Sequence, residues 1–337
     1  MRSGRSWWIA LALPAAVLVC AGAWLLREAA QQGRPVPVLM YHNLSADPGD
    51  DVWTVGIADF ERHLQSLRAQ GYRSILPEDL MRATRRRRLL PRKPVIITFD
   101  DGLLSVQEHA EPLLRRYGLR AIAYIISDRA APEGEPRRTY RGDPCLTQAE
   151  VAGLEARGVL RIGGHGHTHA RHPNVTAGET ATNRQLLQEW TGARVHDFCY
   201  PYGAHPPVLV EAVRAVGFRT AMVCEDQVAV FRRDMDLLRI PRVSVFGGER
   251  NIQIERLLPD PEEGDDLVFR GRNDGLPLPV LPVLVSGRRR VPLDPPPVHP
   301  LGPEPQRWRW PRAVAGGGAE AAHVELWDVH RVLQLYP

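Results

Sequence analysis

Short apolar runs alternate with amphipathic helical patterns along residues 35–245, and this alternation restricts the chain to few folds. The strand-type runs lie at 37–43, 72–76, 95–99, 121–127, 160–165, 197–203, 219–224 and 238–245. Strands that alternate with helices form parallel sheets, because right-handed crossovers pack each helix back onto the sheet. The sequence therefore predicts an α/β fold with a barrel-like number of parallel strands, whose active edge lies at the strand C-termini.

The helical patterns carry local start and stop signals. Apolar residues along 57–67 share one face of a helix that is predicted to end near Gly71. Thr147 and Glu150 form a capping box that opens a helix ending at Gly158. Further helices are predicted at about 106–117, 179–191 and 207–216.

The apolar run at 95–99 ends in two adjacent carboxylates, Asp100 and Asp101. In parallel α/β folds the C-terminal mouth of a buried strand is where ligands bind, which makes both residues site candidates. The alternative is that they cap the helix that follows. The pair alone does not distinguish these two roles.

Four histidines lie within eight residues in the segment RIGGHGHTHARHP: His165, His167, His169 and His172. Crowded imidazolium groups would repel one another, whereas neutral imidazole is a common metal ligand. Two histidines and one carboxylate leave coordination positions open for water and substrate, as in catalytic metal sites. The sequence therefore predicts a catalytic metal site.

Three motifs in chain order resemble the first three motifs of the polysaccharide deacetylases, the NodB-homology family or carbohydrate esterase family 4. They are TFDDG at 98–102, HGHTH at 165–169 and FCYPYG at 198–203. The resemblance spans 36–246 and implies a distorted (β/α) barrel. The segments PVLMYHNL and LRIPRVSV further resemble the branch that de-N-acetylates exported poly-N-acetylglucosamine.

The resemblance implies a role for each acidic and histidine residue of the motifs. Asp101, His165 and His169 would hold one divalent metal ion, with Zn²⁺ expected and Co²⁺ or Ni²⁺ as substitutes. Asp100 would be the base that takes a proton from the attacking water. The two adjacent carboxylates would thus have separate tasks.

The same resemblance assigns the substrate side of the site. Tyr200, Pro201 and Tyr202 would contact the oxyanion or the substrate, with a backbone N–H near Tyr202 facing the oxyanion. The downstream Leu-x-His motif that usually supplies the acid is missing. His42, after the first strand, is therefore expected to protonate the departing amine. The alternative is that His42 only forms a hydrogen bond at the barrel rim.

The chain departs from the family pattern at several positions. Gly166 stands where the family commonly has Ser or Thr, so one supporting hydrogen bond is missing or comes from Thr168. Cys199 stands where many members have Arg, so the contact that orients the base comes from elsewhere or is absent. His167 and His172 are extra, and we expect them to line the pocket without binding metal.

The function implied by the resemblance is a metal-dependent hydrolase that removes N-acetyl groups from N-acetylglucosamine in an exported or cell-wall polysaccharide. Peptidoglycan, chitooligosaccharide or acetylated xylan are alternative substrates for the same chemistry. A glycan-binding protein on an inactive barrel is an alternative of a different class. The presence of Asp100 argues against it, since a binding module needs no base.

The N-terminal segment 6–26 contains 21 residues without a charge, which is long enough to span a bilayer. Arg2 and Arg5 precede it and favour a cytoplasmic N-terminus. We expect residues 1–34 to be a signal anchor and linker that hold the domain outside a bacterial cell membrane, where polysaccharide synthesis or export proteins would be partners. The alternative is secretion after cleavage of this segment.

The remaining composition separates a catalytic domain at 35–257 from a tail at 258–337, which is rich in Pro, Arg and Gly and is expected to be disordered. The net charge is only +4 and no Lys/Arg-aromatic stripe occurs, so we expect no nucleic-acid binding. The four arginines at 85–88 suggest either a solvated loop or a contact with anionic lipid or polymer. Cys199 and Cys224 are expected either as one disulfide or as free thiols.

Overall fold

The computed structural model describes residues 33–247, except for positions 50, 52, 86–87, 172, 175 and 226–227, together with five strand segments between 266 and 327. The predicted anchor at 6–26 lies outside the described residues. Within the described part, no helix is both long and apolar enough to cross a membrane.

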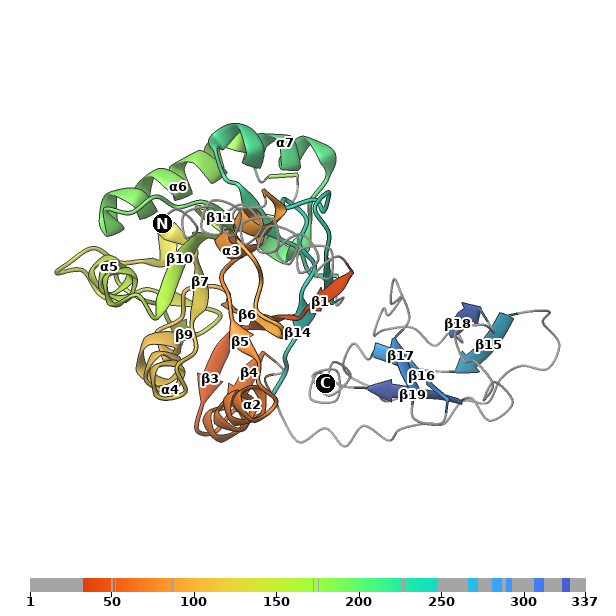
Figure 1. Ribbon diagram of the computed structural model, residues 1–337. Helices are drawn as coiled ribbons and strands as arrows, with labels where there is room; N and C mark the ends of the chain where they lie inside the picture. The colour runs from red at the N-terminus through yellow and green to blue at the C-terminus, as the bar shows by residue number, and fades with distance from the viewer. Residues whose placement is uncertain are drawn as a thin grey trace, which may run out of the picture.

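A curled parallel sheet forms the centre of the domain (Figure 1). Its strand order is β12-β11-β10-β7-β6-β2-β14, and the short β5 pairs with the start of β6. The strands are β2 (Val38–Tyr41), β5 (Arg73–Ser74), β6 (Pro94–Phe99), β7 (Ala121–Ile125), β10 (Leu160–Gly164), β11 (Asp197–Cys199), β12 (Thr220–Met222) and β14 (Val243–Ser244). All of these pairs are parallel, as the alternation of strands and helices predicts.

The last segment of the domain joins the two edges of this sheet. Ile240 forms a single parallel bridge with Met222 of β12, and β14 then pairs with β2 on the opposite edge. The N–H of Val245 donates to the carbonyl of Met40 at 2.9 Å. The expected distorted barrel is therefore present as a curled sheet that is bridged by only a few residues of the last segment.

The helices that cover the sheet begin and end close to the predicted positions. They are α2 (Ile57–Ala69), α3 (Pro77–Thr84), the π-helix η1 (Val106–Ala110) with α4 (Glu111–Arg116), α5 (Gln148–Arg157), α6 (Ala177–Thr191) and α7 (Pro207–Val216), with 3-10 turns η2 (Ser127–Arg129) and η3 (Pro201–Gly203). The predicted capping box is confirmed, since the Thr147 hydroxyl accepts from the N–H of Glu150. Gly158 ends α5 with a left-handed backbone, which glycine adopts without steric cost. Helix α3 was not predicted.

Alternate strand residues pack on the two faces of the sheet. Leu39 and Ile97 belong to the apolar layer beneath the helices, whereas Val38 and Ile96 belong to a second cluster on the concave face. This alternation places Thr98 and Arg242 on the concave side, where both are buried. Polar groups inside such a core need partners, and they find them in the candidate site described below.

Short two-stranded elements surround the sheet. They are β1 (Arg34–Val36) with β13 (Ala229–Phe231), β3 (Asn43–Ser45) with β4 (Thr54–Gly56), and β8 (Thr139–Tyr140) with β9 (Asp143–Pro144). The hairpin β8–β9 carries Tyr140, which reaches the predicted metal ligands. The cysteines 145, 199 and 224 are free thiols, so the disulfide alternative for Cys199 and Cys224 is wrong in this structure.

The C-terminal part of the chain differs from the predicted irregular tail in five segments. They are β15 (Asp266–Gly271), β16 (Leu281–Ser286), β17 (Arg289–Pro292), β18 (Gln306–Pro311) and β19 (His323–Trp327). β15 pairs with β18, and β16 pairs with both β17 and β19, all antiparallel. Hydrogen bonds between distant segments decide such pairing, whereas the local proline content favours an irregular chain. The boundary predicted at 257 lies outside the described residues.

Candidate active site

The register of the parallel strands brings the C-terminal ends of β2 and β6 together at the predicted active site. Tyr41 of β2 is paired with Phe99 of β6, so His42 and Asp100 leave the sheet side by side. The N–H of Asp100 donates to the carbonyl of Tyr41 at 2.9 Å. Asp101 then adopts a left-handed backbone (φ 70°), so the two carboxylates enter different surroundings.

Asp100 is held by a buried arginine. Nη1 and Nη2 of Arg242 donate to the two carboxylate oxygens at 2.7 and 2.8 Å, and the arginine side chain is 0% exposed. Burial alone raises the pKa of Asp100, but the charges of Arg242 and then His165 outweigh burial and hold this pKa well below its usual value. Asp100 is therefore an ionised carboxylate with a fixed orientation.

Arg242 fills the space beside Cys199. Its Nη2 donates to the sulfur of Cys199 at 3.0 Å and to that of Cys224 at 3.3 Å, and its Nη1 donates to the Thr98 hydroxyl at 3.1 Å. The arginine thus supplies the contact that the family resemblance led us to expect at position 199. Arg242 was not predicted as a site residue from the sequence. An arginine within a run predicted to be a buried strand was the available signal, because such a charge needs a buried partner.

The predicted metal ligands form one buried group. Oδ1 of Asp101 lies 3.6 Å from Nε2 of His165 and 3.7 Å from Nε2 of His169, and the two imidazole nitrogens are 3.1 Å apart. The ligand atoms of these three residues all lie within 4.8 Å of one another. The structure therefore brings together the three residues that the sequence analysis chose.

The hydrogen bonds of this group suit a divalent cation. Nδ1 of His165 donates to the carbonyl of Cys199 at 2.9 Å, which leaves the lone pair of Nε2 free. Nδ1 of His169 lies 2.8 Å from the Tyr140 hydroxyl, so its Nε2 also faces the group. Burial, and then the charge of Asp100, raise the pKa of Asp101 to about 8. A bound cation would satisfy both lone pairs and stabilise this carboxylate in its ionised form.

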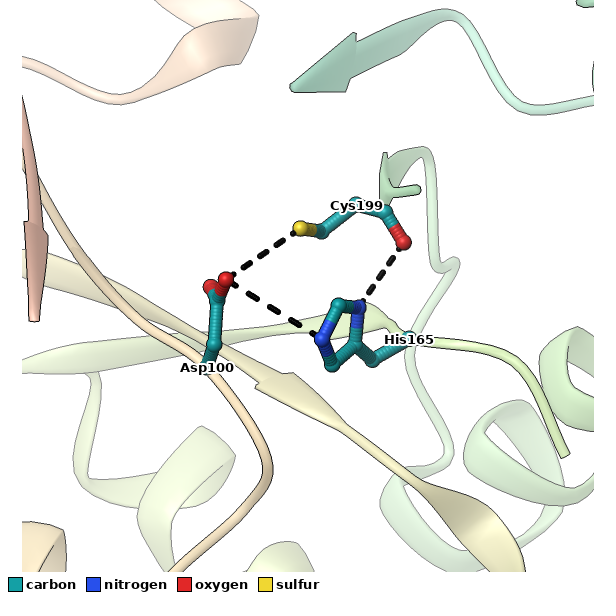
Figure 2. Close-up of side chains that lie close together, drawn as sticks. All are labelled: Asp100, His165 and Cys199. Atoms are coloured by element: carbon teal, nitrogen blue, oxygen red, sulfur yellow. Dashed lines mark hydrogen bonds and ion pairs between the residues drawn. The ribbon is translucent and has the colours of Figure 1, made fainter. Parts of the chain in front are cut away.

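A second group of ligand-type atoms shares His165 (Figure 2). In it, the thiol of Cys199 donates to Oδ2 of Asp100 at 3.4 Å, and this oxygen lies 4.0 Å from Nε2 of His165. Arg242 already compensates the charge of Asp100. The Asp101 group has no such counter-charge among the ion pairs of the described residues, so it fits a cation better.

His42 stands on the other side of Asp100. Its Nε2 lies 4.0 Å from Oδ2 of Asp100, and its ring centroid lies 4.5 Å from that of Trp53. Burial lowers the pKa of His42 to about 4, against an opposing effect of the Asp100 charge. His42 is therefore neutral at rest, and its Nδ1 has no hydrogen-bond partner among the described residues.

The YPYG segment lies next to the predicted metal ligands. Tyr202 has a left-handed backbone (φ 58°) and is 47% exposed, and its ring centroid lies 4.5 Å from that of His169. The guanidinium of Arg171 lies 3.7 Å from the centre of the Tyr202 ring. Pro201 and Tyr200 are buried beneath it. Tyr202 is thus a partly exposed aromatic residue between Arg171 and His169, while the predicted contact of its N–H with an oxyanion stays a prediction.

The extra polar residues of the histidine loop have structural contacts. Nδ1 of His167 lies 2.9 Å from the Ser127 hydroxyl, away from the metal-type group. Thr168 donates from its hydroxyl to Glu179 at 2.9 Å, and Glu179 also accepts from the N–H groups of both loop residues. Thr168 therefore helps to hold the loop after Gly166, whereas His172 lies outside the described residues.

Comparison with known proteins decides the family. The sequence model described as polysaccharide deacetylase matches residues 88–221, which include both aspartates and the histidine loop. The chain therefore carries a polysaccharide deacetylase domain over these residues. One similar protein is YxkH of Bacillus subtilis (strain 168), whose name places it among the polysaccharide deacetylases. It is 24% identical over 230 residues, which are 67% of this chain and 76% of that protein.

Solved structures of this family share the fold. IcaB from Ammonifex degensii is 27% identical with a TM-score of 0.55, and the similarity covers 64% of this chain and 93% of that chain. BC0361, a polysaccharide deacetylase from Bacillus cereus, is 23% identical with a TM-score of 0.54. The match to BC0361 covers 63% of this chain and 65% of that chain, so this chain spans just under two thirds of BC0361. The predicted enzyme class, a hydrolase of the polysaccharide deacetylase type, is confirmed by these matches.

Proposed function

We propose that this domain removes N-acetyl groups from N-acetylglucosamine units of an exported or cell-wall polysaccharide of the poly-N-acetylglucosamine type. The observation that carries the proposal is the placement of an arginine-bound carboxylate and a neutral histidine 4.0 Å apart beside a buried group of metal-type ligands. The similarity to IcaB supports this branch of the family. In the poly-N-acetylglucosamine branch the acid histidine follows the first strand, and the position of His42 beside Asp100 is compatible with that role.

Asp101, His165 and His169 would hold the divalent metal, with Zn²⁺ expected for two imidazoles and one carboxylate, and Co²⁺ or Ni²⁺ as substitutes. When bound, such an ion lowers the pKa of a water molecule and polarises the acetamide carbonyl. The buried hydrogen bond between His165 and the carbonyl of Cys199 keeps Nε2 directed at the ion.

Asp100 would be the base. It is ionised because Arg242 outweighs the effect of its burial, and both of its oxygens are fixed by the guanidinium. A carboxylate so oriented accepts the proton of the attacking water as the oxygen forms its bond to the carbonyl carbon. Arg242 acts through Asp100 and is therefore a positioning residue.

His42 would deliver the proton to the departing amine. Its low pKa means that it begins neutral, so it must first receive a proton before it can act as an acid. Asp100 is the nearest source, since 4.0 Å separates Oδ2 from Nε2 of His42. We propose that the proton taken from water passes across this gap and then to the nitrogen as the C–N bond breaks. Acetate and a free amine result.

The exposed ring of Tyr202 would bind a face of the sugar next to the reacting acetamide, because pyranose rings offer C–H groups that pack on aromatic faces. The backbone N–H near Tyr202 would face the oxyanion, with Pro201 and Tyr200 fixing the turn beneath. In the cell we propose a location outside the bacterial membrane, anchored through 6–26 or secreted after its cleavage, with polysaccharide synthesis or export proteins as partners.

Acetate release from a panel of acetylated glycans, with and without a chelator, tests the proposal. Poly-N-acetylglucosamine should release acetate in a chelator-sensitive reaction, and Asp100→Asn should reduce kcat by ~10²–10⁴-fold. Faster release from peptidoglycan, chitooligosaccharide or acetylated xylan would reassign the substrate. Binding of glycan without any release would favour the glycan-binding alternative.

A further inference from the structure

A cavity lined by cationic side chains lies at the N-terminal ends of the strands, opposite the candidate active site at their C-terminal ends. His196 and Arg219 come directly before β11 and β12, at the starts of strands whose ends carry site residues. Arg184 of α6 and Arg194 of the following loop complete the cationic lining of this cavity of about 540 Å³. The other lining residues are uncharged. The residues that line it belong to α6, to the loop between α6 and β11, and to the turn between α7 and β12. Figure 1 shows α6 and α7 next to β11.

The three arginines of this cavity have no ion-pair partner among the described residues, and Glu78 is the carboxylate whose charge acts on His196. Arg184 is held by backbone, since its Nε donates to the carbonyl of Val195 at 2.8 Å and its Nη1 to that of Val216 at 3.2 Å. In the described part of the chain, no carboxylate forms an ion pair with Arg184, Arg194 or Arg219. Other surface arginines of the domain do form such ion pairs, for example Arg116 with Glu61 and Arg137 with Glu150.

The convergence of these groups has an electrostatic cost. Burial lowers the pKa of Arg184, and the charges of Arg219 and Arg194 lower it further. Burial, followed by Arg219 and Arg184, also lowers the pKa of His196. Nδ1 of His196 is buried and has no hydrogen-bond partner among the described residues. An anion in the cavity would relieve the mutual repulsion of the three guanidinium groups.

We propose that this cavity binds a phosphate group, either that of an anionic phospholipid or free phosphate. The planar fork of a guanidinium matches two phosphate oxygens, and two unpaired forks, Arg194 and Arg219, are available here. An adjoining cavity of about 340 Å³ shares Arg219 and adds Arg85 and Arg214. Its carboxylate, Asp236, is paired with Arg239 at 2.9 Å. The cationic surface thus continues to Arg85, which favours a lipid surface with many phosphates.

A bilayer bound at this edge would leave the catalytic edge facing away from the membrane. The active-site residues follow the C-terminal ends of β2, β6 and β10, whereas the cationic cavity lies at the N-terminal ends of β11 and β12. Because the strands are parallel, these are opposite edges of one sheet. Lipid binding here would therefore orient the enzyme toward a polymer outside the membrane without obstructing the site.

Flotation of the full-length protein with vesicles tests the lipid source. The readout is the difference in affinity between phosphatidylcholine vesicles with and without phosphatidylglycerol, because the apolar segment 6–26 would bind both equally. Arg194→Gln/Arg219→Gln should reduce that difference ~25-fold, at about 1 kcal/mol for each arginine near an anionic surface. The control Arg62→Gln/Arg116→Gln removes the same charge elsewhere and should change it less than twofold. Acetate release from a soluble substrate should be unchanged in both variants.

Titration with inorganic phosphate, followed by calorimetry and by competition with the vesicles, tests the shared chemistry. Saturable binding that the Arg194/Arg219 variant loses and the control variant keeps supports the site, and competition with anionic vesicles assigns the lipid source. Arginine-dependent phosphate binding without such vesicle binding assigns free phosphate. The proposal is overturned if the Arg194/Arg219 variant and the control variant lose phosphate and vesicle binding equally while their unfolding temperatures are unchanged. It is also overturned if neither phosphate nor anionic vesicles bind in a way that depends on these arginines.

Discussion

Replacement of Arg242 by methionine should damage both stability and the base. The guanidinium is fully buried and donates to both oxygens of Asp100 at 2.7 and 2.8 Å. Loss of one partner of a buried ion pair leaves an uncompensated charge and costs about 3–5 kcal/mol. Without Arg242, burial dominates the pKa of Asp100 and raises it, so the carboxyl becomes protonated near neutral pH. We therefore expect kcat at neutral pH to fall by ~10²-fold or more, with partial recovery at alkaline pH.

Urea unfolding and pH-rate profiles of four proteins measure these effects: wild type, Arg242→Met, Asp100→Asn and the double variant. The double variant should be destabilised by less than the two single variants together, with a coupling of about 1–3 kcal/mol, since neither charge is left alone. In the wild type the pKa of Asp100 is depressed, so its stabilisation is present above the unfolded value of ~3.9 and is lost as pH falls. The stability difference between wild type and Arg242→Met should accordingly shrink in acid.

Arg239→Met is the matched control, because this arginine lies in the same segment but pairs with Asp236 near the surface. It should leave the pH-rate profile unchanged. Two results would refute the reasoning: strictly additive stability losses in the Asp100/Arg242 cycle, or an Arg242→Met profile whose acid limb has not moved toward higher pH.

Four further outcomes follow from the site and the fold. Isothermal titration with Zn²⁺ or Co²⁺ should show about one site that Asp101→Ala or His165→Ala abolishes and His167→Ala retains; the reverse pattern would contradict the ligand set. His42→Asn should retain metal while kcat falls at least ~10²-fold; a wild-type kcat would leave His42 a rim residue. In protein freed of metal by a chelator, the unfolded state binds a proton at His42 below pH ~6.5, whereas the folded state binds it only near its pKa of about 4. Up to about 3 kcal/mol of folding stability is therefore lost as pH falls through this interval. The folding stability of His42→Asn should fall less over the same interval in acid denaturation. Deletion of 258–337 should leave a folded, active domain in circular dichroism and acetate release, because the sheet is already bridged at Val245; an insoluble product would show that the C-terminal strands complete the domain.

Elements with local signals were predictable from the sequence. Helix α5 is specified by the capping box of Thr147 and Glu150 at its start and by Gly158 at its end, and all three interactions form between residues close in sequence. The strand β6 was predictable for a similar reason, since five consecutive apolar or β-branched residues are compatible with few other structures. Helix α3 was missed because its start depends on Pro77 after a very short strand, β5.

Interactions between distant residues were not predictable in the same way. Asp100 and Arg242 are 142 positions apart, and no local pattern connects them. The strands of the C-terminal segments were missed for the same reason, because antiparallel partners such as β15 and β18 are separated by residues of strongly irregular composition. The metal-type group was predictable despite its long range, since the family motifs name its members and each follows a recognisable strand.

The cysteine at position 199 and the arginine at position 242 are explained by the same packing arrangement around Asp100. Nη2 of Arg242 lies 3.0 Å from the Cys199 sulfur and 2.8 Å from Oδ2 of Asp100, so the guanidinium occupies space that a longer side chain at 199 would need. An arginine at both positions would direct two buried cations at one carboxylate, with only one negative charge to compensate them. A small thiol at 199 and a guanidinium from the last strand segment therefore require each other. Cys199 alone left two alternatives, that the orienting contact comes from elsewhere or is absent. In the structure, Arg242 of the segment that bridges the sheet makes this contact.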